Sequence, residues 1–146
     1  MIVSIVTSNV GGVFAVMWGL PETADFERIA GEVAALRDLG RPVSYVAIMP
    51  EDMPRVDDHA RKGLMKLTEQ LSESCACVCV ILETTGFRGA ILRSMMTALN
   101  LVTRKHDRVR FVDSAEAAMS FLSSTGNCTR DEVAQAIEEL RTKAAA

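Results

Sequence analysis

The chain has 146 residues, of which 49% are hydrophobic and 24% are charged, and its formal net charge is −3. A domain of this size buries roughly two-thirds of its unfolded surface, so a single core suffices without disulfides or a metal. The slight negative charge argues against a broad surface for nucleic acid or acidic lipid. The amino terminus lacks the pattern of a signal peptide, and no apolar run reaches the ~18 residues of a membrane span. We therefore expect one cytoplasmic domain, residues 1–146.

The amino-terminal part of the chain predicts a β-hairpin. Residues 2–6 and 13–18 are strand-like, and residues 8–12 between them contain Asn and Gly, which tolerate the backbone conformations of tight turns. A helix is expected from about residue 22, because Pro21 ends the strand and acidic side chains follow it. Gly40 is the expected C-cap of this helix.

Two apolar runs are the strongest structural signal in the chain. Residues 43–49 and 75–82 are almost continuously apolar, as expected of strands that are covered on both faces. They should therefore be adjacent and parallel in the middle of a sheet. Each run leads into a polar turn and an amphipathic helix, expected at about 57–72 and 90–101.

The remaining sequence predicts a short strand and two helices. The strand is expected at about residues 109–112, followed by a helix capped by Asp113 with Glu116 completing a capping box. Thr129 and Glu132 have the same spacing at the start of a last helix. The element order, a hairpin followed by βα units, predicts an α/β fold with helices on the faces of the sheet.

The cysteine pattern favours thiols packed in the core over a disulfide or a metal site. Cys75, Cys77 and Cys79 alternate along one predicted strand, which would place all three on one face about 6.5–7 Å apart. This geometry does not suit a disulfide between neighbours, and the spacing is not that of a zinc knuckle. A metal site would need Cys128 or a histidine to approach. We expect reduced, buried thiols, and we expect His59 and His106 to be solvated.

The chain resembles the SpoIIAA-like or STAS family over residues 2–122. The resemblance rests on the element order, the Trp-Gly-Leu-Pro start of the first crossover at residues 18–21, the strand at 45–48 and the segment at 114–122. It implies a single mixed β-sheet with an N-terminal hairpin, βα crossovers and helices largely on one side. Here a C-terminal helical extension is added at about residues 129–143. The fold predicted is thus a single-domain, STAS-like α/β fold.

Members of this family that act as anti-sigma-factor antagonists carry a phosphorylatable Ser or Thr at the start of the helix after a central strand. The matching stretch, residues 49–58, contains no hydroxyl side chain. Asp57 and Asp58 are expected to cap the helix, where the helix dipole favours a carboxylate. The alternative is that they imitate a phosphorylated state by a permanent negative charge. We expect docking of a partner here without phosphorylation at the usual position.

The carboxyl ends of the central strands are the predicted place for function, because ligands of parallel sheets bind beyond these ends. Backbone N–H groups near Gly86 could bind an anion with help from Arg88 or Arg93, although the phosphate-loop pattern is missing. Glu51, Asp52 and Glu83 could also meet there as paired carboxylates. The residues predicted to bind a partner are Met49, Glu51, Asp52, Met53, Asp57, Asp58, Thr84, Thr85, Phe87, Arg88 and Arg93.

Two functions remain open from the sequence. The first is a non-enzymatic regulatory domain that binds a protein partner, with no cofactor, metal or nucleic acid. The second is a domain that binds a small apolar or anionic molecule or a lipid, or an enzyme, with a pocket near the strand ends lined by Trp18, Phe87 and Met96. A concave apolar pocket would favour the second, and a flat face the first. Homo-oligomer formation is compatible with both.

Overall fold

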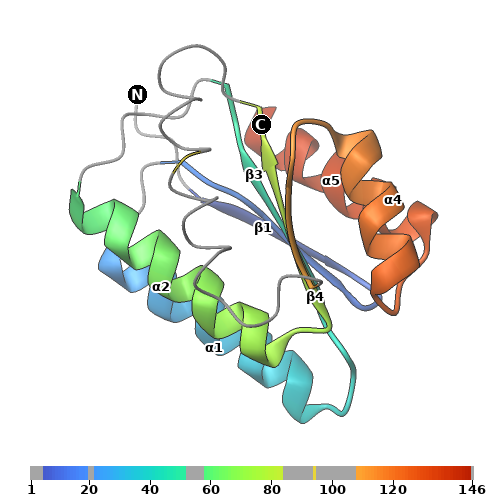
Figure 1. Cartoon of the computed structure of the whole chain (residues 1–146), viewed down its shortest axis with the longest axis horizontal. Helices are drawn as coiled ribbons and strands as arrows, with labels where there is room; N and C mark the ends of the chain where they lie inside the picture. The colour runs from blue at the N-terminus through green and yellow to red at the C-terminus, as the bar shows by residue number, and fades with distance from the viewer. Residues whose placement is uncertain (1–4, 20–21, 52–57, 84–93, 95–107, 146) are drawn as a thin grey trace.

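The structure, a computed structural model, describes residues 5–19, 22–51, 58–83, 94 and 108–145. Within these residues one sheet contains β1 (Val6–Val10), β2 (Val13–Met17), β3 (Ser44–Met49), β4 (Cys77–Leu82) and β5 (Val109–Val112). The helices are α1 (Thr23–Asp38), α2 (Asp58–Ser74), α4 (Ala115–Thr125) and α5 (Arg130–Ala145) (Figure 1). The helix expected at 90–101 lies outside the described residues. None of the described helices combines the length and the apolar composition needed to cross a membrane.

The strand order in the sheet follows the order in the chain, β1-β2-β3-β4-β5. The strands β1 and β2 pair antiparallel as a hairpin, and β2 continues the sheet by pairing parallel with β3. The strands β3 and β4 are adjacent and parallel, with Val46 opposite Cys79. The predictions of an α/β fold, of an N-terminal hairpin in the sheet and of parallel central strands are confirmed.

Helices cover both faces of the sheet. Figure 1 shows α1 and α2 on one side and α4 and α5 on the other. In β3, Tyr45 and Ala47 pack toward the first pair, whereas Val46 and Ile48 pack toward the second. Every residue of β3 and β4 is consequently buried, which explains their continuous apolar sequence. The STAS resemblance implied helices largely on one side, and the described helices differ from this by lying two on each face.

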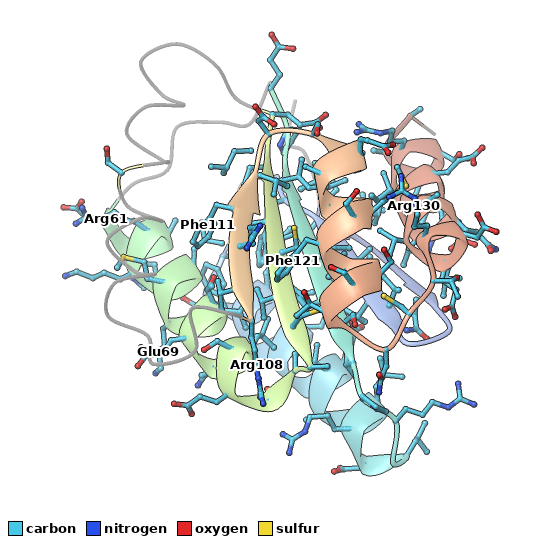
Figure 2. The ribbon with its side chains drawn as sticks, turned by 45° about the vertical axis from the view of Figure 1, so that its right-hand side comes forward. Arg61, Glu69, Arg108, Phe111, Phe121 and Arg130 are labelled. Carbon is cyan, nitrogen blue, oxygen red and sulfur yellow. The ribbon has the colours of Figure 1, made fainter. Side chains whose placement is uncertain are left out.

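The sheet edge at β5 follows the same two-sided pattern. Figure 2 shows Phe111 of β5 on the side of α2, and Phe121 of α4 on the opposite side. Phe111 packs against the α1/α2 core, and Phe121 belongs to the α4/α5 core. The Arg110 guanidinium lies over the Phe121 ring at 5.0 Å from its centroid, so this exposed arginine also contributes to packing.

Of three local features predicted from the sequence, the structure corrects two and confirms one. The hairpin turn is only Gly11–Gly12, with a φ of 56° at Gly11, because the first strand extends to Val10. The N-cap of α4 is Ser114, not Asp113, since the Ser114 hydroxyl accepts a hydrogen bond from the Ala117 N–H at 3.2 Å. The capping box of α5 is confirmed: the Thr129 N–H donates to the Glu132 carboxylate, and the Glu132 N–H donates to the Thr129 hydroxyl.

The cysteine prediction is right about burial and wrong about the shared face. Cys75, Cys77 and Cys79 are free thiols with at most 2% exposure. Cys77 and Cys79 face α4 and α5, whereas Cys75 packs in the core under α1 and α2. The reason is that β4 begins only at Cys77, and the Cys75 N–H still donates to the Leu71 carbonyl at the end of α2. Strand alternation therefore does not extend to Cys75.

Candidate functional site

An open cleft lies at the carboxyl edge of the parallel strands. Its lining includes Glu51, Glu83 and Asp113, each within two residues of the end of β3, β4 or β5, together with Arg141 of α5. The cleft has a volume of about 640 Å³. The parallel strands bring these carboxylates to one edge, because the carboxyl ends of such strands point the same way. Helix α5 packs on one face of the sheet and brings Arg141 to this edge.

Glu83 is held in the cleft by hydrogen bonds of both its backbone and its side chain. Its backbone N–H donates to the Met49 carbonyl at 2.9 Å, which continues the pairing of β3 and β4 by one residue. Its carboxylate accepts two hydrogen bonds from the Arg141 guanidinium, Nη2 to Oε2 at 3.1 Å and Nη1 to Oε1 at 3.4 Å. This two-pronged pairing fixes the orientation of both groups. Both side chains keep contact with solvent, being 46% exposed for Arg141 and 29% for Glu83.

The position of Arg141 depends on how α5 packs. Val133, Ile137 and Leu140 of α5 are buried against the sheet, which sets the rotation of the helix about its axis. Arg141 directly follows the buried Leu140, so its side chain lies beside the buried face of α5 and reaches the cleft. On the same helix, Glu139 accepts a hydrogen bond from Ser8 of β1 at 2.5 Å, which holds α5 on the hairpin.

The described residues that line the cleft carry more negative than positive charge, with three carboxylates and one guanidinium. Arg141 compensates Glu83, and neither Glu51 nor Asp113 has an ion-pair partner among the described residues. Both of these side chains are exposed, so they are available to a cationic group from outside. In the part of the chain that the structure describes, no three His, Cys, Asp or Glu side chains are arranged to hold a metal ion. The carboxylates border the cleft without converging on one point.

The structure places three of the predicted partner-binding residues. Glu51 lines the cleft, as its position after β3 predicted. Asp58 is exposed in the first turn of α2, where it pairs with Arg61 at 3.2 Å, and it is not among the described residues that line the cleft. Met49 is only 2% exposed and packs in the α1/α2 core, so its side chain does not offer a contact to a partner. The others, Asp52, Met53, Asp57, Thr84, Thr85, Phe87, Arg88 and Arg93, lie outside the described residues.

Trp18 was predicted to line a pocket, but its side chain is buried in the core. Trp18 is 1% exposed, and its ring packs against Phe26 of α1 with 5.6 Å between ring centroids. It is thus part of the core, while Phe87 and Met96 lie outside the described residues. His59 is exposed as predicted and forms a hydrogen bond with the Thr23 hydroxyl at 2.8 Å. His106 is not among the described residues.

Two cleft residues were missed by sequence reasoning. Asp113 was interpreted as a helix cap, although its place directly after a parallel strand is the same signal that selected Glu51 and Glu83. Arg141 lies in what was predicted to be an extension, and no local pattern marks it. Its contribution depends on long-range packing between α5 and the sheet.

Comparison with protein-family models, with curated proteins and with solved structures finds no match to this chain. The geometry of the cleft is therefore the starting point for a function.

Proposed function

We propose that this protein is a non-enzymatic, STAS-like regulatory domain that binds a protein partner at the carboxyl edge of its sheet. The observation that carries the proposal is the charged, open cleft formed by Glu51, Glu83, Asp113 and Arg141. An open cleft whose described lining is charged suits the polar contacts of a reversible complex better than the enclosure of a substrate. The missing hydroxyl side chain in residues 49–58 supports regulation without phosphorylation at the usual helix start.

The charge of the cleft indicates the chemistry of the partner. Glu51 and Asp113 present two carboxylates without described ion-pair partners, beside the Glu83–Arg141 pair. A partner segment that carries Lys or Arg side chains would complement this surface. Exposed charges of this kind act mainly on the association rate and on specificity, and their effect falls with ionic strength.

A small cationic metabolite is the second candidate ligand. The volume of about 640 Å³ lies within the range of roughly 300–1,000 Å³ that is typical of small-molecule sites. The charges of the described lining favour a cationic ligand over an apolar one. Native mass spectrometry of the protein purified from its own cells would separate the two candidates, since a retained metabolite adds a defined mass.

The test uses two charge-matched variants. Glu51→Gln with Asp113→Asn removes two negative charges at the cleft, and Glu27→Gln with Glu32→Gln removes two exposed charges from α1. A partner is first captured from lysate and identified, and its binding to each purified variant is then measured at two salt concentrations. We expect the cleft variant to bind at least about tenfold more weakly, equivalent to about 1.4 kcal/mol, and to lose salt dependence.

The α1 variant should bind like the wild type, because its charges lie away from the cleft. Equal weakening in both variants would attribute the effect to net charge alone and reject the cleft as the binding site. Wild-type affinity in the cleft variant would reject the proposal directly. Thermal unfolding of both variants checks that each is folded.

A further inference from the structure

A second polar cluster lies at the opposite end of the parallel strands. Ser44 and Cys77 are register partners at the amino ends of β3 and β4. The turn between α4 and α5 packs directly on them: a Cβ atom built on Gly126 would lie 2.3 Å from Ser44 Oγ and 2.8 Å from Cys77 Sγ. Only a residue without a side chain permits this approach, so the turn backbone is in close contact with both side chains.

Cys128 brings another thiol to this turn. Its Sγ donates to the Leu122 carbonyl at 3.4 Å, and the same carbonyl accepts the Gly126 N–H at 2.8 Å. Cys128 packs against the α4/α5 core, which contains Cys77. Both sulfur atoms thus lie around the same short turn. Cys77 is fully buried, while Cys128 is partly exposed and offers a route from solvent.

The Ser44 hydroxyl lies near both thiols of this cluster. It is 1% exposed and, among the described residues, has no hydrogen-bond partner of good geometry. Its proximity lowers the pKa of the Cys77 and Cys128 thiols, but burial has the larger effect and raises both above their ordinary value. Both thiols are therefore predominantly protonated at neutral pH. Cys128 adds to the rise in the pKa of Cys77, as expected of two thiols that lie near each other.

We propose that Cys77 and Cys128 are a redox modification site and form an intramolecular disulfide when the protein meets hydrogen peroxide. The fraction of Cys128 that has lost its proton attacks one peroxide oxygen as the thiolate and the O–O bond breaks. The departing hydroxide takes up that proton and leaves as one water, so that Cys128 becomes a sulfenic acid. The Cys77 sulfur then attacks the Cys128 sulfur, and the hydroxyl leaves as a second water. In total the two thiols lose two protons and two electrons, and one peroxide is reduced to two waters.

The other cysteines do not fit this reaction. Cys75 packs on the opposite face of the sheet, and Cys79 lies two residues further along β4 with no exposure. Cys128 is the one cysteine of the described residues that is not buried, so it is the site of first attack. The product would tie the turn before α5 to β4. Cys128 lies two residues before α5, the helix whose Arg141 lines the cleft, but this inference is independent of the proposed function.

The experiment treats the folded full-length protein with excess hydrogen peroxide and then blocks the remaining thiols with a maleimide. We expect slow formation of a monomer that is lighter by about 2 Da before blocking and has two fewer alkylated cysteines. Peptide mapping without reduction should recover a linked pair containing Cys77 and Cys128. Reduction with dithiothreitol should restore both thiols.

Variants keep the result interpretable. Cys128→Ser should abolish the loss of about 2 Da. Cys79→Ser is the matched control, because Cys79 lies on the same face of β4 as Cys77, and this variant should still lose about 2 Da. Circular dichroism confirms folding, and the peptide map of the wild type stands even if a variant does not fold. A disulfide that joins other cysteines, a link between two molecules, or oxidation of Cys128 to sulfinic acid without a disulfide would overturn the proposal, as would unchanged thiols after prolonged treatment.

Discussion

The two ends of the parallel sheet use polar residues in opposite ways. At the carboxyl edge, charged side chains border an open cleft, and the ion pair of Glu83 and Arg141 stays in contact with solvent. At the amino edge, an uncharged hydroxyl and thiols are covered by the turn at Gly126. Charges are expensive to bury, whereas hydroxyl and thiol groups are less so. The closed edge is therefore covered by packing, whereas the charged side chains of the open edge remain in contact with solvent.

The largest predicted effect is a loss of unfolding free energy at alkaline pH, which the buried thiols should cause. Burial raises the pKa of Cys79 from 9.0 to about 12, and it raises the pKa of Cys75 to about 12 as well. Above about pH 9 the unfolded chain ionises its thiols while the folded protein keeps them protonated, so the unfolded state binds fewer protons. The free energy of unfolding should then fall between about pH 9 and pH 12, by up to about 1.4 kcal/mol per pH unit for each thiol.

Urea denaturation at intervals from pH 7 to pH 11 measures this loss. Cys79→Ala should be less stable at every pH because of the cavity, but its decline above pH 9 should be shallower than that of the wild type. A parallel decline in both proteins would show that Cys79 is not responsible.

A substitution at Gly126 should be the most damaging single change at the closed edge. Gly126→Ala places a methyl group 2.3 Å from Ser44 Oγ and 2.8 Å from Cys77 Sγ, so the turn or the strands must shift. We expect a loss of about 1–3 kcal/mol in unfolding free energy. Gly31→Ala is the matched control, because an added Cβ in that exposed turn of α1 meets nothing within 4 Å. It should stabilise the protein by up to about 1 kcal/mol.

Opposite signs for these two glycine substitutions are the expected result in chemical denaturation. Equal and small effects would mean that the α4–α5 turn adjusts without cost and that the amino edge is not closely packed.

Ser44→Ala should have a smaller effect and the opposite sign to Gly126→Ala. The Ser44 hydroxyl is buried without a good hydrogen-bond partner among the described residues, so its removal should raise the unfolding free energy by about 1 kcal/mol. It also removes the atom nearest to the added methyl group. In a double-mutant cycle with Gly126→Ala we expect a favourable coupling of about 0.5–1 kcal/mol. Strict additivity would place the Ser44 hydroxyl away from the turn.

The parts of the fold that were predictable have local causes. Continuous apolar runs identified β3 and β4 as central strands, and the spacing of Thr129 and Glu132 identified the start of α5. The face of Cys75 was predicted wrongly because α2 extends to Ser74 and the strand begins later than the apolar run. Apolar character alone does not distinguish the last turn of a buried helix from the first residues of a strand.

The candidate site also has a part that the sequence could predict and a part that it could not. Glu51 and Glu83 were placed at the strand ends because parallel strands align their carboxyl termini. Arg141 was not found, because its place in the cleft depends on the rotation of α5, which is set by the burial of Val133, Ile137 and Leu140 against distant strands. The division of helices between the two faces is likewise a property of long-range packing, and the order of elements along the chain does not specify it.

The smallest stability effect is expected at the open edge. The Arg141–Glu83 pair has good two-pronged geometry, but its side chains are 46% and 29% exposed, so water screens the attraction. Arg141→Gln should change the unfolding free energy by less than about 1 kcal/mol, and a double-mutant cycle with Glu83→Gln should give a coupling of about 0.2–1 kcal/mol that shrinks in high salt. Denaturation of the four proteins at low and high ionic strength measures this. A coupling well above 1 kcal/mol that resists salt would mean that the pair behaves as a buried structural bridge, and the carboxyl edge would then resemble the amino edge in holding the fold together.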